Sequence, residues 1–282
     1  MNSSNMQAAD ALYREDIWPV VIGNLPERAR IAVTDSAMTA GIITENTLRK
    51  YGILSGTNRP IVMDKIDPEQ DGLVNGYTNG NNIGLNEYIV PHTSAFYKLS
   101  RKLSESQNPF AKYLYDKLSR PINNLVRTIV HEKLHIATQM KERYTGSGSR
   151  TDFLTDLQEA TKEYLNERLP RFLKPLSEYL ASRMIVPMAE GLNEGMTYEA
   201  FGLKGNRKIK EAAANEPTSY ARFTEIAADS LNEIGTGSPG EFYGNYFRDG
   251  CIAAKKYVGA FFKSFGRYLS QQPQAACACT TV

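Results

Sequence analysis

The chain has 282 residues, of which 41% are hydrophobic and 23% are charged, and its formal net charge is +2. This length suffices for one large domain or two small ones, and the nearly balanced charge gives no indication of a nucleic-acid partner. Three cysteines do not make a disulfide framework, and no apolar run approaches the length of a membrane span. We therefore expect a globular protein of a reducing compartment, without a transmembrane segment.

The N-terminal segment Met1–Met6 is polar and lacks the basic and then apolar layout of a signal peptide. This predicts a cytoplasmic protein, or one that reaches a target cell by a non-classical secretion route. Residues 7–17 favour a short helix, and the run from Arg28 to Val33 favours a strand.

Between residues 35 and 92, glycine, asparagine, aspartate and proline punctuate short apolar runs. Apolar runs bounded by turn residues predict short strands. The predicted strands are Ile61–Met63, Leu73–Val74, Ile83–Leu85 and Tyr88–Val90. We assign residues 1–92 to the strand-rich N-terminal part of one α+β domain.

Helical periodicity dominates the rest of the chain up to residue 270. The segments with apolar residues at helical spacing are 94–118, 120–143, 152–183, 185–203, 218–234 and 240–270. Pro170 and Pro175 are expected to kink or divide the third of these segments. Residues 93–270 therefore form a helical part, and residues 271–282, which are low in apolar bulk, form a flexible tail.

A glycine- and serine-rich linker, Thr145–Ser149, follows the 120–143 helix. Thr151 or Asp152 then offers a side-chain oxygen that can cap the next helix. The apolar residues on the helix before the linker lie at helical spacing and predict a buried face. These residues are Leu125, Ile129, Leu134, Ile136 and Met140.

The 120–143 helix carries the pattern His-Glu-x-x-His at residues 131–135. Because helical residues four apart share a face, His131 and His135 project side by side and can chelate one divalent metal ion, usually zinc. Glu132 lies about 100° further round the helix, where a carboxylate can take a proton from a water molecule beside the metal. The competing interpretation is two surface histidines on an amphipathic helix with an ordinary glutamate between them.

Further along, Met188–Glu199 contains Leu-Asn-Glu-Gly at residues 192–195. Together with His-Glu-x-x-His, this motif resembles the gluzincin metallopeptidases, loosely over residues 120–250 and most closely their small toxin-like or effector-like members. The resemblance implies a zincin-like fold, with a small N-terminal mixed sheet followed by a mainly helical body. It also implies that Zn²⁺ is held by His131, His135 and Glu194, with Glu132 as the catalytic carboxylate.

The motif departs from the family pattern at one position. Small members often have a second glutamate four positions after the ligand glutamate, but Tyr198 occupies that place and Glu199 comes one residue later. The identity of the residue that supports the metal ligands is therefore open. The competing interpretation of Glu194 is a solvated helix carboxylate.

Members of this family commonly stabilise the oxyanion with a tyrosine or histidine downstream of the third ligand, and no histidine follows His135. We predict that Tyr246 has this role. The alternatives are Tyr243, Arg248 and Tyr220, and core packing competes with all of them because the chain has 16 tyrosines. The remaining histidine, His92, is more typical of a surface or hydrogen-bonding residue than of a fourth ligand, which would close the site.

These features predict a zinc-dependent peptidase that acts on proteins or peptides, preferably as an endopeptidase. Zinc lowers the pKa of its water, and Glu132 accepts the proton and passes it to the leaving amine. A strand within Ile83–Val90 is expected to line the cleft, where its edge either pairs with an extended substrate or only packs under the helix. The alternatives are an aminopeptidase of the same clan and a non-catalytic binding protein on the zincin scaffold. The oligomeric state is not predicted.

Two cysteines, Cys277 and Cys279, lie close to the end of the chain. Cys279 is fourth from the end, the position of a prenylated cysteine, although threonine follows it where aliphatic residues are preferred. C-terminal lipidation is therefore the weaker alternative to an unmodified tail. Cys251 is predicted to be a helix-packing residue and not a nucleophile, because no histidine is available to activate it.

Overall fold

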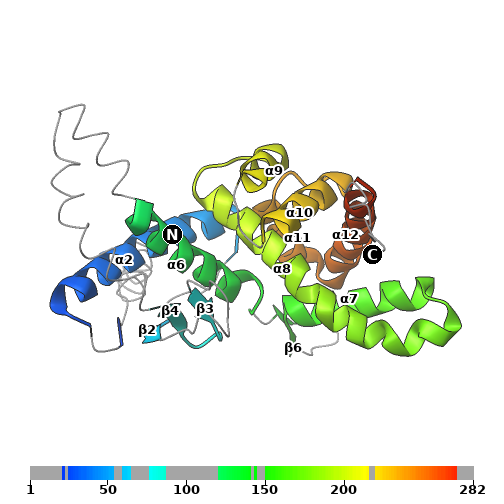
Figure 1. The fold of residues 1–282 in the computed structure, drawn as a ribbon, viewed down its shortest axis with the longest axis horizontal. Helices are drawn as coiled ribbons and strands as arrows, with labels where there is room; N and C mark the ends of the chain where they lie inside the picture. Colours follow the sequence, from blue (N-terminus) through cyan, green and yellow to red (C-terminus); the bar gives the residue numbers. More distant parts are fainter. Residues whose placement is uncertain are drawn as a thin grey trace, which may run out of the picture. The chain divides into compact units, whose positions relative to one another are not determined.

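The computed structural model describes residues 21–22, 25–53, 59–64, 76–86, 120–140, 143–144, 150–215 and 220–271. The chain divides into two compact units, Met1–Arg143 and Tyr144–Val282. The described residues of the first unit form a small sheet and two long helices, and those of the second are almost entirely helical (Figure 1). The protein is therefore of the α+β class, as predicted.

The first unit contains a mixed four-stranded sheet with the order β1-β2-β4-β3. Its strands are β1 (Val21–Ile22), β2 (Ile61–Asp64), β3 (Gly76–Thr78) and β4 (Ile83–Asn86). The pairs β1–β2 and β2–β4 are parallel, whereas β3 pairs antiparallel with β4. The predicted strands Ile61–Met63 and Ile83–Leu85 are confirmed, and Leu73–Val74 and Tyr88–Val90 lie outside the described residues.

Strand β4 is internal because β2 and β3 occupy its two sides. Of the two alternatives left open for the 83–90 segment, pairing of a free edge with a substrate is therefore excluded for its described part, Ile83–Asn86, and packing of the sheet under the helix remains. The edge strand next to it is β3, which packs against helix α6 (Arg120–Thr138). A β-carbon on Gly76 would lie only 2.7 Å from Thr128 Cγ2, so glycine lets this strand approach the helix closely.

The first unit also contains helix α2 (Glu27–Lys50), which packs along α6 (Figure 1). The predicted strand from Arg28 to Val33 is wrong, because these residues form the first turns of α2. Small and apolar residues are buried at helical spacing along this helix, and this long pattern outweighs the local strand preference. They include Ala29, Ala32, Val33, Ala37, Ala40 and Leu48.

In the second unit, the described helices surround an aromatic core. They are α7 (Phe153–Arg168), the 3₁₀ helix η1 (Arg171–Leu176), α8 (Ser177–Ala200), α9 (Asn206–Ala214), α10 (Ala221–Glu233), α11 (Pro239–Asp249) and α12 (Cys251–Gln271). The largest fully buried side chains of this core are Phe153, Phe242, Tyr243, Tyr246, Tyr257 and Phe261. Their rings meet mostly edge to face or tilted, which is a favourable geometry for aromatic pairs.

The predicted helix boundaries of this unit are confirmed at the start of α7 and for α10, whereas α9 was not predicted. Asp152 caps α7 by accepting a hydrogen bond from the Thr155 amide at 2.8 Å. Pro170 ends the α7 segment and precedes η1, and Pro175 lies within η1, so the predicted division of the 152–183 segment is confirmed. The predicted break between 183 and 185 is wrong, because α8 runs without interruption from Ser177 to Ala200 and continues through Pro187. The predicted 240–270 segment is two helices, because Gly250 adopts a φ of 59° that ends α11.

Two short strands, β5 (Arg143–Tyr144) and β6 (Arg150–Thr151), pair with each other before α7 begins. The linker Thr145–Ser149 between them lies outside the described residues. Across the helices that the structure describes, none combines the length and the apolar character that crossing a bilayer requires.

Candidate metal centre

The two histidines of the motif face one point beside α6. His131 Nε2 and His135 Nε2 lie 3.0 Å apart, and the rings meet edge to face with centroids 4.7 Å apart. Two nitrogens bound to one tetrahedral zinc ion, with Zn–N bonds of about 2.0–2.1 Å, lie about 3.3 Å apart. The imidazoles therefore already hold nearly the separation that two ligands of one ion require.

A glutamine one turn after His135 fixes the orientation of its ring. His135 Nδ1 lies 2.7 Å from Gln139 Oε1, and both side chains are buried. An amide oxygen only accepts, so Nδ1 carries the proton and Nε2 keeps its lone pair. This is the usual arrangement of a metal-ligating histidine and its supporting partner. Gln139 was not among the residues predicted from the sequence, although its i+4 spacing from His135 is visible there.

The carboxylate of Glu132 lies in the buried part of α6. Only 6% of Glu132 is exposed, and the apolar residues Ile129 and Leu134 on the same helix are fully buried. Charges interact more strongly in such surroundings than in water, because the local dielectric constant is lower. A buried glutamate next to a histidine pair is thus well suited to moving a proton.

Helix α8 carries two carboxylates one turn apart, Glu190 and Glu194. Glu194 is buried with 8% of its surface exposed, and Glu190 is partly buried. Among the described residues, His131, His135 and Glu190 form a His-His-Glu group that could hold a metal ion. Glu194, the ligand predicted from the sequence, is not a member of this group.

Both glycines that follow these carboxylates are required by close helix packing. A β-carbon on Gly191 would lie 2.4 Å from the backbone oxygen of Phe223 in α10. A β-carbon on Gly195 would lie 2.9 Å from Pro239 Cγ at the start of α11. Each Glu-Gly pair of α8 therefore has two functions. The glutamate supplies a carboxylate, and the glycine lets α10 or α11 pack closely against α8.

Glu199, the glutamate displaced by one position from the family pattern, has a different partner. Its Oε2 accepts a hydrogen bond from the Gly240 amide at 3.1 Å, in the first turn of α11. A carboxylate at this place satisfies an amide that has no partner within its own helix. Tyr198, which occupies the family position, packs in a small cluster with Ile209 and Ala213. Glu199 therefore has a structural role in joining α8 to α11.

Tyr246, the predicted oxyanion donor, lies in the aromatic core. It is fully buried, and its hydroxyl donates to Asp156 Oδ2 at 2.6 Å while its ring packs against Phe153. This position supports packing and gives no support to a role in oxyanion stabilisation. Of the alternatives, Tyr243 is also fully buried, Arg248 bonds to Asn245 and Tyr220 is exposed.

The cysteines and the third histidine can be placed only in part. Cys251 is exposed at the start of α12, so the prediction that it packs in the core is wrong. His92, Cys277 and Cys279 lie outside the described residues, and the predictions made for them stay predictions.

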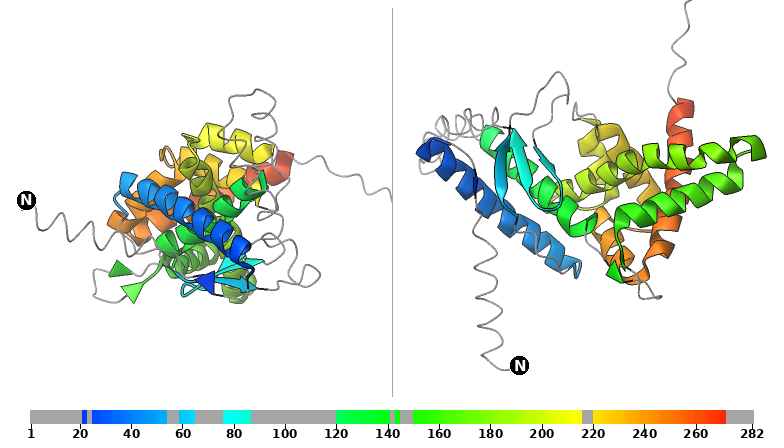
Figure 2. Two further views of the ribbon diagram at one scale, coloured as in Figure 1. Left: turned by 90° about the vertical axis from the view of Figure 1, so that its left-hand side faces the viewer. Right: turned by 90° about the horizontal axis from the view of Figure 1, so that it is seen from below.

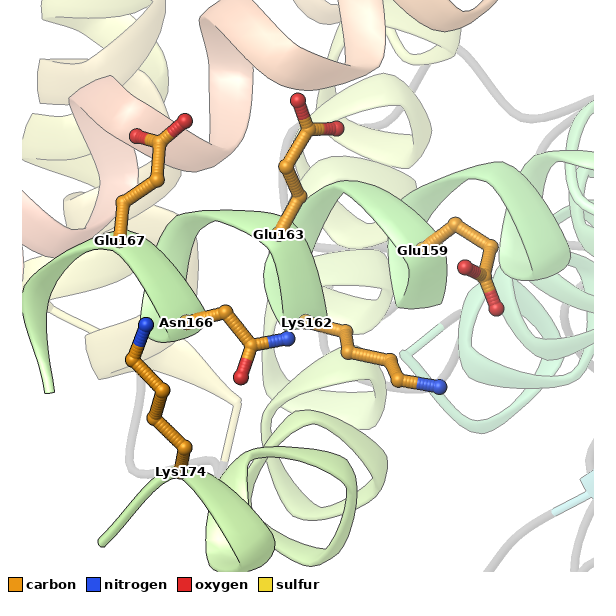
Figure 3. Close-up of a pocket in the computed structure, with 6 residues that line it drawn as sticks. All are labelled: Glu159, Lys162, Glu163, Asn166, Glu167 and Lys174. Carbon is orange, nitrogen blue, oxygen red and sulfur yellow. The ribbon is translucent and has the colours of Figure 1, made fainter. Parts of the chain in front are cut away.

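A hollow of about 430 Å³ lies on the surface of α7 and η1. Figure 3 shows the side chains that line it. Its lining is charged or amide-bearing throughout: Glu159, Lys162, Glu163, Asn166, Glu167 and Lys174. Glu163 is already paired with Lys255 of α12 at 2.6 Å. With oppositely charged side chains in the same open hollow, we assign no chemistry to it.

No protein-family model, no curated protein and no solved structure matches this chain. The interpretation of the metal centre therefore depends on the residues themselves. Those residues are the two histidines, Glu132 and Gln139 of α6 and the two carboxylates of α8.

Proposed function

We propose that this protein is a zinc-dependent peptidase with a zincin-like metal site on α6. The observation that carries the proposal is the pair of Nε2 atoms 3.0 Å apart, with the ring of His135 held by Gln139. Two imidazoles and one carboxylate are a typical ligand set of hydrolytic zinc sites, in which a fourth position stays open. The residues present therefore fit zinc.

The third ligand comes from α8, and two observations bear on its identity. The resemblance to Leu-Asn-Glu-Gly favours Glu194, whereas the His-His-Glu group contains Glu190. With Glu190 as the ligand, the glutamate expected four positions later is present as Glu194. With Glu194 as the ligand, Tyr198 occupies that place. We therefore propose Glu190 as the third ligand and Glu194 as the residue that supports it.

Zinc at this site would acidify a water molecule and polarise the carbonyl of the scissile bond. His131 and His135 would hold the ion, and the hydrogen bond to Gln139 keeps the lone pair on His135 Nε2. Glu132 takes the proton from the attacking water on a carboxylate oxygen and returns it to the leaving amine. The proposed substrate is a peptide or protein cleaved at an internal bond.

The test uses the full chain and the Glu132→Gln variant, which keeps the shape of the side chain but cannot accept the proton. Both proteins should contain one zinc ion per chain, and only the wild type should create new N-termini in a cell lysate. Full activity of Glu132→Gln would contradict the role of Glu132. Absence of zinc from both proteins would favour a binding protein, and stepwise loss of N-terminal residues would indicate an aminopeptidase.

A further inference from the structure

Exposed hydrophobic side chains are concentrated at one end of the α7–α8 hairpin. The described part of the chain exposes twelve large hydrophobic side chains, and five of them fall between residues 172 and 186. These five are Phe172, Leu176, Tyr179, Leu180 and Val186. Phe172 is 79% exposed and Tyr179 is 59% exposed, so more than half of the surface of each residue is in contact with solvent. Such a concentration of apolar surface usually marks an interaction site.

The turn that presents these residues projects from its unit. Figure 2 (right) shows the hairpin of α7 and α8 extending past α12, with the turn at its far end. Pro170 precedes η1 and Pro175 lies within it, and no residue of this 3₁₀ helix is buried. Because proline fixes its own backbone angle, the turn is stiff and holds its side chains outward. We refer to residues 168–183 as the hairpin tip.

Positive charge surrounds the apolar side chains of the hairpin tip. Arg168, Arg171, Lys174 and Arg183 lie within it, and Glu178 is its single acidic residue. In the described part of the chain, no ion pair involves Arg171, Lys174 or Arg183. The formal net charge of the tip is therefore +3. Arg168 is paired with Glu167 and Lys174 shares a hollow with three glutamates, so Arg171 and Arg183 are the charges best placed to meet an external anion.

A second basic surface adjoins the hairpin tip at Arg168. Arg168 lies 3.7 Å from the ring of Tyr164 and lines a hollow of about 560 Å³ together with residues of α12. Lysines at positions 255, 256 and 263 line the same hollow, whose acidic member is Glu233. Lys255 is paired with Glu163 and Lys263 with Glu233, so Lys256 is the lysine of this hollow that can add to the charge of the tip.

We propose that the hairpin tip docks on the surface of an anionic lipid membrane. Aromatic and aliphatic side chains at a protruding turn can enter the boundary between headgroups and acyl chains, while arginine and lysine bind the phosphates. A protruding turn offers little area for a specific protein partner, which typically covers about 800 Å² on each side. The docking is peripheral, and it does not depend on the proposed peptidase activity.

The test measures co-sedimentation of the full chain with phosphatidylcholine vesicles that contain or lack phosphatidylserine. We expect binding only to the anionic vesicles and release in high salt. The variant Phe172→Ser/Tyr179→Ser should bind about tenfold more weakly, because it loses the apolar contacts. The variant Arg171→Gln/Lys174→Gln should lose about fivefold for each charge removed.

Matched controls change the same residue types elsewhere in the same unit. Phe201→Ser/Tyr220→Ser replaces two exposed aromatic residues outside the tip, and Arg207→Gln/Lys208→Gln removes two exposed charges from α9. Both should bind like the wild type. Equal binding of the tip variants and the wild type would overturn the proposal, as would equal binding to neutral vesicles. Binding to poly-glutamate but not to vesicles would replace it with an acidic protein partner.

Discussion

His135 Nδ1 lies 2.7 Å from Gln139 Oε1, one helical turn further along α6. This bond determines which nitrogen of His135 carries the proton, and therefore which nitrogen can bind a metal ion. Both residues are buried, so water cannot replace Gln139 without a rearrangement. Gln139 is therefore a positioning residue of the proposed zinc site.

Replacement of Gln139 by leucine tests this role. Leucine fills a similar volume but offers no acceptor, so the His135 ring loses its fixed orientation. We expect zinc affinity to fall about 10–100-fold, as measured by competition with a chelator of known affinity. The variant Gln139→Glu keeps an acceptor oxygen and should bind zinc at least as well as the wild type. Equal affinity of Gln139→Leu and the wild type would show that the bond does not support the metal.

The two carboxylates of α8 can be distinguished by single substitutions. Because we assign Glu190 as the ligand, Glu190→Gln should lose stoichiometric zinc during purification. Glu194→Gln should retain zinc with about 10–100-fold weaker affinity, as expected for a supporting residue. Metal analysis by mass spectrometry measures the zinc content of both variants. Glu178→Gln, at an exposed position of the same helix, is the control. The opposite result would assign the ligand to Glu194.

The parts of the site that lie within one helix could be predicted from the sequence. The i+4 spacing alone places His131 beside His135, because helix geometry fixes neighbours within one turn. The same rule connects His135 to Gln139, which was missed because an isolated glutamine suggests no chemistry. The bond between Glu199 and the Gly240 amide could not be predicted, since it joins residues 41 positions apart.

Long-range packing also decided the predictions that failed. The run from Arg28 to Val33 has a local preference for strand, but the apolar pattern along the whole of α2 makes it helical. Strand β4 was recognised from its own residues, whereas its internal position depends on pairing with β2 and β3. The oxyanion role of Tyr246 stays a prediction, and its packing against Phe153 could not be predicted from the sequence because it depends on how α7 and α11 meet.

Gly191→Ala tests the close approach of α8 and α10. The new β-carbon would lie 2.4 Å from the Phe223 backbone oxygen, and a backbone atom cannot move aside as a flexible side chain can. We expect the free energy of unfolding to fall by about 1–3 kcal/mol, which is typical of overpacking. Urea denaturation followed by circular dichroism measures this change.

Gly266→Ala in α12 is the matched control, because no atom lies within 4 Å of its added β-carbon. This exposed helix position should gain about 0.5–1 kcal/mol, since alanine loses less backbone entropy than glycine on folding. A stabilised Gly191→Ala variant would show that the two helices do not approach as closely as described.

Tyr246→Phe separates packing from catalysis. The phenylalanine ring can still pack against Phe153, but Asp156 loses the hydrogen bond from the tyrosine hydroxyl. We expect a loss of about 1–3 kcal/mol in stability, because a hydrogen bond to the half-buried carboxylate of Asp156 is lost. The kcat of the folded variant on a peptide substrate should be unchanged. A fall of about 10²–10³-fold in kcat without loss of stability would instead assign Tyr246 to the oxyanion.

Tyr257 should make the stability of the second unit depend on pH in the alkaline range. Burial raises the pKa of its hydroxyl well above the ordinary value of 10.0, and the neighbouring Tyr243 raises it further. The unfolded chain therefore releases this proton at a lower pH than the folded chain does. The resulting contribution to stability is fully present below about pH 10 and is lost as the pH rises towards the folded-state pKa.

The variant Tyr257→Phe removes this titration together with the hydrogen bond from the hydroxyl to the Met188 carbonyl. Near pH 8 the variant should be less stable than the wild type by about 1 kcal/mol, the usual value of one hydrogen bond. Above pH 10 this difference in stability between the variant and the wild type should shrink or reverse. The reason is that only the wild type has a hydroxyl at position 257 that then loses a proton on unfolding. Urea midpoints at the two pH values measure this, with Tyr268→Phe in the same helix as the control for loss of a hydroxyl. A difference that stays constant with pH would show that Tyr257 does not titrate with unfolding.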